Sequence, residues 1–175
     1  MTIIYLNEAA REGAAPAEEV GAKAAILAKV AAAGVPVPPA FVLPIRLGAA
    51  LIAGDVEAEK DFAEGLREGI EYLQNATGRR FGDRREPLLV SVRSGAARSM
   101  PGMLDTVLDV GCTKAATRGL IRMTGNPRFA WDCRRRFLEA YAETVLGLDP
   151  AILFSQRDAL IAYVEAEFLR LAVDR

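Results

Sequence analysis

The segment with the most polar and conformationally permissive residues spans positions 91–102 and reads SVRSGAARSMPG. Its small residues allow backbone amides to approach a ligand closely, and Ser94 and Ser99 add hydroxyl groups. Arg93 and Arg98 carry planar guanidinium groups that match the oxygens of a phosphate. The segment is therefore a candidate phosphate cradle, and the alternative interpretation is an ordinary loop with two solvated arginines.

A second candidate for anion binding is Lys23, in the sequence Gly21-Ala22-Lys23-Ala24. These residues lie near the start of an expected helix, where free amides and the helix macrodipole attract anions. The lysine would add a positive charge opposite a phosphate. The glycine, lysine and hydroxyl spacing of a P-loop is absent, and the alternative interpretation is a solvated lysine on a helix.

Three consecutive arginines, Arg134, Arg135 and Arg136, form the third basic group. On a helix, three neighbouring residues fan over about 200°, so at least one of them should point toward the apolar side. The alternative is a solvated basic face. Acidic residues are mixed among the arginines, aromatic stacking partners are few, and the net charge is −1. We therefore expect no nucleic-acid partner.

The sequence offers little for metal or covalent chemistry. Asp105 could bind a metal ion, but one carboxylate makes a poor magnesium site, so we predict an exposed carboxylate and no metal site. The chain contains no histidine, which excludes a phosphohistidine or an imidazole base within it. Cys112 and Cys133 are too few for a disulfide framework and are expected to be small buried residues.

The elements that would position these residues follow from hydrophobic periodicity and from turn signals. Strands are expected at 2–6, 40–43, 88–92 and 103–110, and helices at 16–33, 45–52, 56–77, 113–124, 126–146 and 151–175. Gly78 is expected to end the third helix, and Thr113 and Asn126 should cap the next two. The order predicts an α+β fold, helix-rich with a small sheet, in a single domain over residues 1–175.

The same patterns predict which faces are buried. The run at 88–92 is apolar and is expected to be a buried strand. Two helical stripes and one strand face are expected to point inward: Val20, Ala24, Leu27 and Ala31; Phe129, Cys133, Phe137, Tyr141 and Val145; and Leu104, Thr106, Leu108 and Val110. No apolar run is long enough to span a bilayer and no signal peptide is evident. We expect a cytoplasmic protein without a membrane partner.

The sequence SVRSGAARSMPGMLDTVLDVG resembles the nucleotide-binding segment of the pyruvate phosphate dikinase family. GAKAAILAKVAAAGVPVPPAFVL resembles the early lysine helix and proline-rich exit of that family, and NPRFAWDCRRRF resembles a later helix. The resemblance covers about residues 1–150. It implies part of an ATP-grasp domain that binds ATP and Mg2+ and passes phosphate to a histidine on a separate swivelling domain. A third, barrel domain then converts pyruvate to phosphoenolpyruvate.

The resemblance also implies roles for individual residues. Lys23 and Arg93 would contact the ATP phosphates, Met103 would lie near the nucleotide, and one of the two arginines 135 and 136 would face the transferred phosphoryl group. The residues that the resemblance places at the ATP site are Lys23, Arg93, Ser94, Met103, Arg135 and Arg136. No catalytic residue is assigned.

Two departures from the family pattern leave two hypotheses. The glycine-rich GGKG of the family is Gly21-Ala22-Lys23-Ala24 here, and two added methyl groups could obstruct phosphate. We expect the second ATP-grasp half, with the acidic metal ligands, and the histidine and barrel domains to have no counterpart within these 175 residues. One hypothesis is an ATP-binding half that works with a partner chain and is inactive alone. The other is a non-catalytic remnant that binds a partner protein or self-associates.

Overall fold

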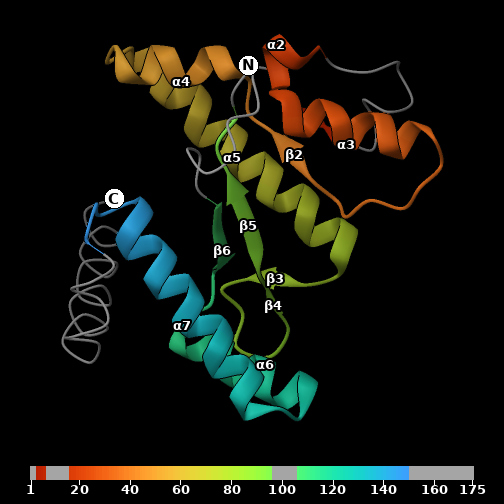
Figure 1. Ribbon diagram of the computed structural model, residues 1–175, viewed down its shortest axis with the longest axis vertical. Coiled ribbons are helices and arrows are strands. Elements are labelled where there is room, and N and C mark those ends of the chain that lie inside the picture. The colour runs from red at the N-terminus through yellow and green to blue at the C-terminus, as the bar shows by residue number, and fades with distance from the viewer. Residues whose placement is uncertain (1–2, 7–15, 96–105, 150–175) are drawn as a thin grey trace. The chain divides into compact units, whose positions relative to one another are not determined.

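The computed structural model describes residues 3–6, 16–95 and 106–149 (Figure 1). The chain divides into two compact units, the first formed by residues 1–81 and 94–104, the second by residues 82–93 and 105–175. The single domain expected from the sequence stays a prediction, and the helix expected at 151–175 lies outside the described residues. Among the described residues, helical positions outnumber strand positions, which confirms the helix-rich α+β class.

The described part of the first unit contains four helices and short strands. Its elements are β1 (Ile4–Tyr5), α2 (Ala17–Val20), α3 (Ala22–Ala32), β2 (Phe41–Val42), α4 (Ile45–Ile52), α5 (Val56–Thr77) and β3 (Arg80–Phe81). Strands β1 and β2 pair antiparallel, with Ile4 opposite Val42. Helix α4 packs against α5 and α2, and α5 also packs against β2.

Helix α5 is the longest described element of this unit, and it is capped at both ends, at Gly78 as the sequence predicts. The Asp55 carboxylate accepts hydrogen bonds from the backbone N–H groups of Glu57 and Ala58 at 2.9 and 3.2 Å, and Gly78 ends the helix at φ 68°. Against its middle lies the ring of Phe41, so close that a Cβ on Gly69 would sit 2.4 Å from the ring. The absence of a side chain at Gly69 is what allows β2 to pack against α5.

The helix expected over 16–33 is two helices, α2 and α3, because Gly21 adopts φ 87° and ψ 153° between them. The break changes which side chains face inward. Val20, Ala25 and Ala28 are buried, whereas Leu27 is 38% exposed. The predicted stripe is therefore confirmed at Val20 and was wrong at Leu27, and Ala24 and Ala31 are only partly buried, because the prediction assumed one continuous helical phase.

The described part of the second unit is a two-stranded ladder with one helix packed against it and a second helix packed against the first. Its described elements are β4 (Pro87–Leu88), β5 (Val90–Arg93), β6 (Thr106–Val110), α6 (Lys114–Thr124) and α7 (Pro127–Thr144). Strands β5 and β6 pair antiparallel, and α7 packs against β6 and α6. Both helix starts predicted from the sequence are confirmed. Thr113 Oγ1 accepts from Ala116 N at 3.1 Å, and Asn126 Oδ1 accepts from Phe129 N at 3.0 Å.

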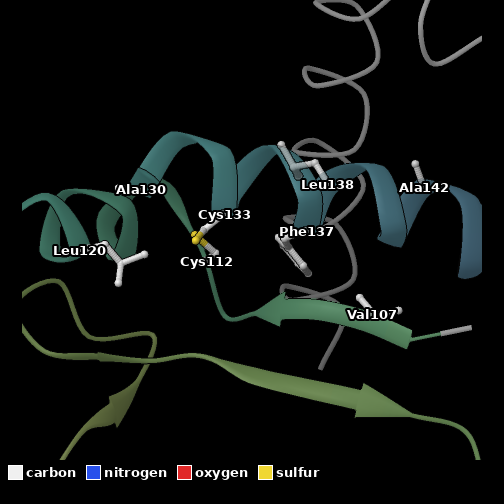
Figure 2. Packing of buried hydrophobic residues seen from close by; sticks show 8 residues of the cluster. All are labelled: Val107, Cys112, Leu120, Ala130, Cys133, Phe137, Leu138 and Ala142. Carbon is white, nitrogen blue, oxygen red and sulfur yellow. The ribbon is translucent and has the colours of Figure 1, made fainter. Parts of the chain in front are cut away.

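The core of the second unit lies between α7, α6 and β6 (Figure 2). Its buried members are Val107, Cys112, Leu120, Ala130, Cys133, Phe137, Leu138 and Ala142. Both cysteines are free and buried, as predicted. The predicted stripe of α7 is confirmed at Cys133 and Phe137 but was wrong at its two ends, because Phe129 and Val145 are 48% and 54% exposed.

A bulge in β6 changes the inward face of that strand. Val90 lies opposite Val110, but Val92 lies opposite Val107, one residue beyond the partner that regular pairing gives. Asp109, between them, has φ 56°. An extra residue in one strand moves the following side chains to the other face. Val107 is therefore buried and Leu108 is 38% exposed, the reverse of the prediction.

The prediction of a buried strand over 88–92 holds only at its start. Leu88 is 5% exposed, but Val92 is 52% exposed and Ser91 is also exposed. Among the described elements, helix α7 packs against β6 and not, to a comparable extent, against β5, which agrees with the exposure of the outer half of β5. Within the described residues, no helix is both long and apolar enough to cross a membrane.

Candidate functional site

In the first unit, the candidate site is built at the junction of α2 and α3. Gly21 holds φ 87° and ψ 153°, a conformation that residues with a side chain adopt only under strain. Lys23 follows as the second residue of α3, and its side chain is exposed. The first amides of a helix have no acceptor within that helix. The junction therefore presents a lysine and, as far as the described residues go, helix amides without a backbone acceptor on the same turn.

The segment that follows β5 approaches this junction. A Cβ built on Gly95 would lie 3.7 Å from the backbone oxygen of Val20 and 3.8 Å from the Ile45 side chain. Gly95 and the exposed Ser94 therefore lie beside the end of α2. Within the first unit, the fold thus brings together the start of the glycine- and serine-containing loop and the Lys23 turn, two features that the sequence identified separately.

The second unit carries the arginine candidates. Arg93 is the last residue of β5, pairs with Thr106 across the ladder, and has an exposed side chain. Arg135 and Arg136 lie on α7. Of the remaining sequence-predicted residues, Arg98, Ser99, Met103 and Asp105 lie outside the described residues.

The three arginines of α7 have different surroundings, as their fan around the helix predicted. Arg134 points inward, is 6% exposed, and donates from Nη1 to the Cys112 carbonyl oxygen at 2.7 Å. Arg135 is 31% exposed and Arg136 is 58% exposed. One arginine is therefore structural, and the other two lie at the surface.

Asp132 binds both surface arginines. Its Oδ1 accepts from Nη2 and Nε of Arg135 at 2.6 and 3.2 Å, and its Oδ2 accepts from Nε of Arg136 at 2.7 Å. Arg135 also donates from Nη1 to Glu139 at 2.5 Å. The hydrogen bonds from Arg135, followed by those from Arg136, lower the pKa of Asp132 below its ordinary value of 3.8. The carboxylate is thus ionised near neutral pH and fixes two guanidinium groups.

A second carboxylate lies near this network. Burial raises the pKa of Asp109, while a hydrogen bond with Cys133 and the charge of Arg136 oppose that change. Burial, together with the Asp109 charge, raises the pKa of Cys133 to about 11. Cys133 is thus a neutral thiol, unsuited to nucleophilic chemistry near neutral pH. Asp109 places one further negative charge near Arg136.

Sequence reasoning missed Asp132 and Asp109. The first had a readable signal, because an acidic residue four positions before an arginine pairs with it on a helix. The second had none, since its place depends on the β6 bulge. No group of three or more potential metal ligands exists among the described residues. The described site therefore offers cationic groups for an anion and no cluster that fits Mg2+.

Comparison with known proteins identifies relatives that are much longer than this chain. The chain is 41% identical over 132 residues to pyruvate, phosphate dikinase of Rhizobium meliloti, which covers 75% of this chain and 15% of that protein. It is 39% identical over 127 residues to the Clostridium symbiosum protein of the same name, covering 73% of this chain and 14% of the relative. For the Rickettsia bellii protein the identity is 37% over 155 residues, covering 88% and 18%.

The chain thus spans less than a fifth of the length of these relatives. No family model matches it. The identities nevertheless extend over most of the chain and include several relatives of the same name. These matches show that the chain belongs to the pyruvate phosphate dikinase family, as the counterpart of one segment of those longer proteins.

Proposed function

We propose that this chain is an ATP-binding portion of a pyruvate phosphate dikinase-like phosphotransferase. The observation that carries the proposal is its 36–41% identity to dikinases from bacteria and protists in a chain that keeps Lys23 and Arg93 exposed. In this proposal Lys23 and Arg93 bind the nucleotide phosphates. Ser94 and Met103 lie beside the nucleotide, and an arginine of α7 binds the phosphoryl group to be transferred.

The described residues fit the phosphates better than they fit a metal. Exposed ammonium and guanidinium groups, and free amides at the start of a helix, are ligands for phosphate oxygens. The absence of a cluster of metal ligands among the described residues means that Mg2+ would be held by ATP itself and by groups outside the described part of the chain. Because phosphoryl transfer depends on positioning and charge stabilisation, these cations would bind and orient ATP.

Isothermal titration calorimetry with MgATP tests the proposal. We expect saturable binding that Arg93→Ala and Lys23→Ala each weaken by about tenfold or more, the loss of a charge-assisted hydrogen bond. Arg79→Ala, which removes an exposed arginine elsewhere, is the matched control and should bind as the wild type does. Titration with tripolyphosphate and with adenosine separates phosphate recognition from base recognition.

The proposal fails if the wild-type chain binds neither MgATP nor tripolyphosphate, alone or with a chain that carries the remaining dikinase segments. It also fails if Arg79→Ala weakens binding as much as Arg93→Ala does. Turnover of ATP with pyruvate and phosphate by the chain alone is not expected, because no residue of this chain is a histidine that could carry the phosphoryl group.

A second candidate function is a non-catalytic interaction module, and it is favoured by two exposed apolar residues, the last residue of α4 and the first residue of α5. Ile52 is 91% exposed and Val56 is 65% exposed, and such a pair on a surface turn can be covered by another protein or a second copy. Sedimentation velocity over a range of concentrations tests self-association. A concentration-independent monomer that Ile52→Ser does not alter would argue against self-association through this turn.

A further inference from the structure

The Asp132 network assigns different roles to the two surface arginines of α7. All three nitrogens of Arg135 donate hydrogen bonds, two to Asp132 and one to Glu139. Arg136 donates only from Nε, again to Asp132. Within residues 3–6, 16–95 and 106–149, neither Nη group of Arg136 has a hydrogen-bond partner. Arg136 is thus held at Nε, and within the described residues both of its Nη groups remain available to a ligand.

The helix geometry explains this arrangement. Arg135, Arg136 and Glu139 follow Asp132 by three, four and seven residues, so the four side chains lie on one face of α7. An acidic residue four positions before a basic residue is the favoured orientation for such a pair. Oδ1 of Asp132 binds Arg135, and Oδ2 binds Arg136. The hydrogen bond to one arginine therefore holds the carboxylate in the orientation that the hydrogen bond to the other arginine requires.

We propose that Asp132 is a positioning residue that orients Arg136, and not Arg135, as the arginine of α7 that contacts the oxygens of a phosphoryl group. This inference rests on the proposed function and goes beyond it, because it selects one arginine and names the residue that holds it. Arg135 anchors the carboxylate. A guanidinium fixed at Nε and free at both Nη atoms presents two donors in a rigid fork, the arrangement that binds phosphate in a bidentate manner.

The inference can be tested by measuring ligand affinity, because charge and positioning predict opposite effects of the same substitution. Asp132→Asn removes a negative charge close to the anion site, and by charge alone it should strengthen the binding of MgATP. Positioning predicts the reverse. We expect Asp132→Asn to weaken MgATP and tripolyphosphate binding by about 3- to 10-fold, a partial loss of one charge-assisted hydrogen bond. Asp132→Glu keeps a carboxylate within reach of Arg136 and should retain more affinity than Asp132→Asn.

Glu143→Gln is the matched control, because it removes one negative charge from the same helix at an exposed residue outside the network. We expect it to bind MgATP as the wild type does, or slightly more tightly. Arg136→Lys should lose as much affinity as Asp132→Asn or more, since an ammonium group lacks the fork. Arg135→Lys should reduce affinity less than Arg136→Lys.

A spectroscopic measurement follows the geometry directly. In NMR spectra of the arginine side chains, the Nε–H signal of Arg136 should exchange slowly with water in the wild type and quickly in Asp132→Asn. Adding tripolyphosphate should shift the Arg136 signal more than that of Arg135. A structural role for Asp132 that did not involve Arg136 would leave this signal unchanged.

The possible outcomes separate the inference from the function on which it rests. If wild-type protein binds MgATP and Asp132→Asn binds it equally or more tightly, the positioning role is overturned while ATP binding stands. If Arg135→Lys is the more damaging substitution, the assignment to Arg136 is wrong. If wild-type protein binds no polyphosphate in any assay, both the proposed function and the anion-contacting role of Arg136 are overturned.

Discussion

Arg134 donates a hydrogen bond from Nη1 to the backbone carbonyl oxygen of Cys112 at 2.7 Å, from a side chain that is only 6% exposed. Cys112 lies just before α6, and Arg134 lies on α7. The hydrogen bond therefore connects the segment just before α6 to the middle of α7. It provides a donor for the carbonyl group of a buried residue that lies outside the described helices and strands.

Arg134→Ala should remove this tie and leave the Cys112 carbonyl without that donor. We expect the free energy of unfolding to fall by about 1–3 kcal/mol, the cost of an unsatisfied buried polar group, measured by urea denaturation followed by circular dichroism. Arg128→Ala, at an exposed position of the same helix, should change it by no more than about 0.5 kcal/mol. Equal effects of the two substitutions would show that the buried hydrogen bond contributes nothing specific.

Two glycines in helices of the first unit provide a matched pair. A Cβ on Gly69 would lie 2.4 Å from the Phe41 ring, whereas a Cβ on Gly48 meets nothing within 4 Å. Alanine favours a helix over glycine by about 1 kcal/mol, but overpacking a core typically costs about 1–3 kcal/mol. Gly69→Ala should therefore lower the melting temperature and Gly48→Ala should raise it or leave it unchanged. If Gly69→Ala is as stable as Gly48→Ala, the Phe41 ring does not pack against α5 as described.

Local signals in the sequence were sufficient to find most of the helices, although β3 and the division between α2 and α3 were not predicted. Gly78 ends α5, and Thr113 and Asn126 cap α6 and α7, at the predicted positions. A cap depends only on a few neighbouring residues, so it can be read without knowledge of the tertiary structure. The strand at 41–42 was found for a similar reason, between prolines and a new helix start.

The buried faces were less predictable, because single residues with unusual backbone angles changed the periodicity. Gly21 at φ 87° divides one expected helix into two, and the bulge at Asp109 moves Val107 into the core in place of Leu108. The sequence predicted that one of three arginines on α7 would point inward. It did not show that this one is Arg134, because that depends on how α7 packs against β6. The candidate anion ligands Lys23 and Arg93 were identified from residue type and position, their ATP contacts were inferred from the resemblance, and those roles stay predictions.

The thiol of Cys133 provides a prediction about pH and reactivity. Burial, followed by the charge of Asp109, raises its pKa from 9.0 to about 11. At pH 8 this should lower the thiolate fraction, and with it the rate of alkylation by iodoacetamide, by about 100-fold relative to the unfolded chain. Mass spectrometry of the peptide that contains Cys133, with and without denaturant, measures the ratio. Equal rates in the two states would contradict a buried thiol beside a carboxylate.

The same pKa has a consequence for stability. Between pH 9 and 11 the thiol ionises in the unfolded chain before it ionises in the folded chain, so the unfolded state binds fewer protons and the folded state loses stability as the pH rises. The melting temperature should decline across this range. In Cys133→Ala the decline should be smaller, and an identical pH profile would assign the loss of stability to other groups.

The two alanines beside Lys23 allow a direct test of whether this site is impaired. The resemblance implies glycines at the positions of Ala22 and Ala24, and both alanines are partly buried in the first turn of α3. If their methyl groups restrict the approach of phosphate to the helix amides, the double variant Ala22→Gly/Ala24→Gly should bind MgATP more tightly, even though glycine destabilises a helix by about 0.5–1 kcal/mol per residue. Calorimetry measures the affinity.

Ala32→Gly is the control for the loss of helix stability, because it introduces a glycine at the exposed far end of the same helix. It should lower the melting temperature slightly and leave the affinity for MgATP unchanged. If the double variant gains no affinity while Lys23→Ala still weakens binding, the methyl groups are tolerated and the turn already functions. If Lys23→Ala also has no effect, phosphate does not bind at the start of α3.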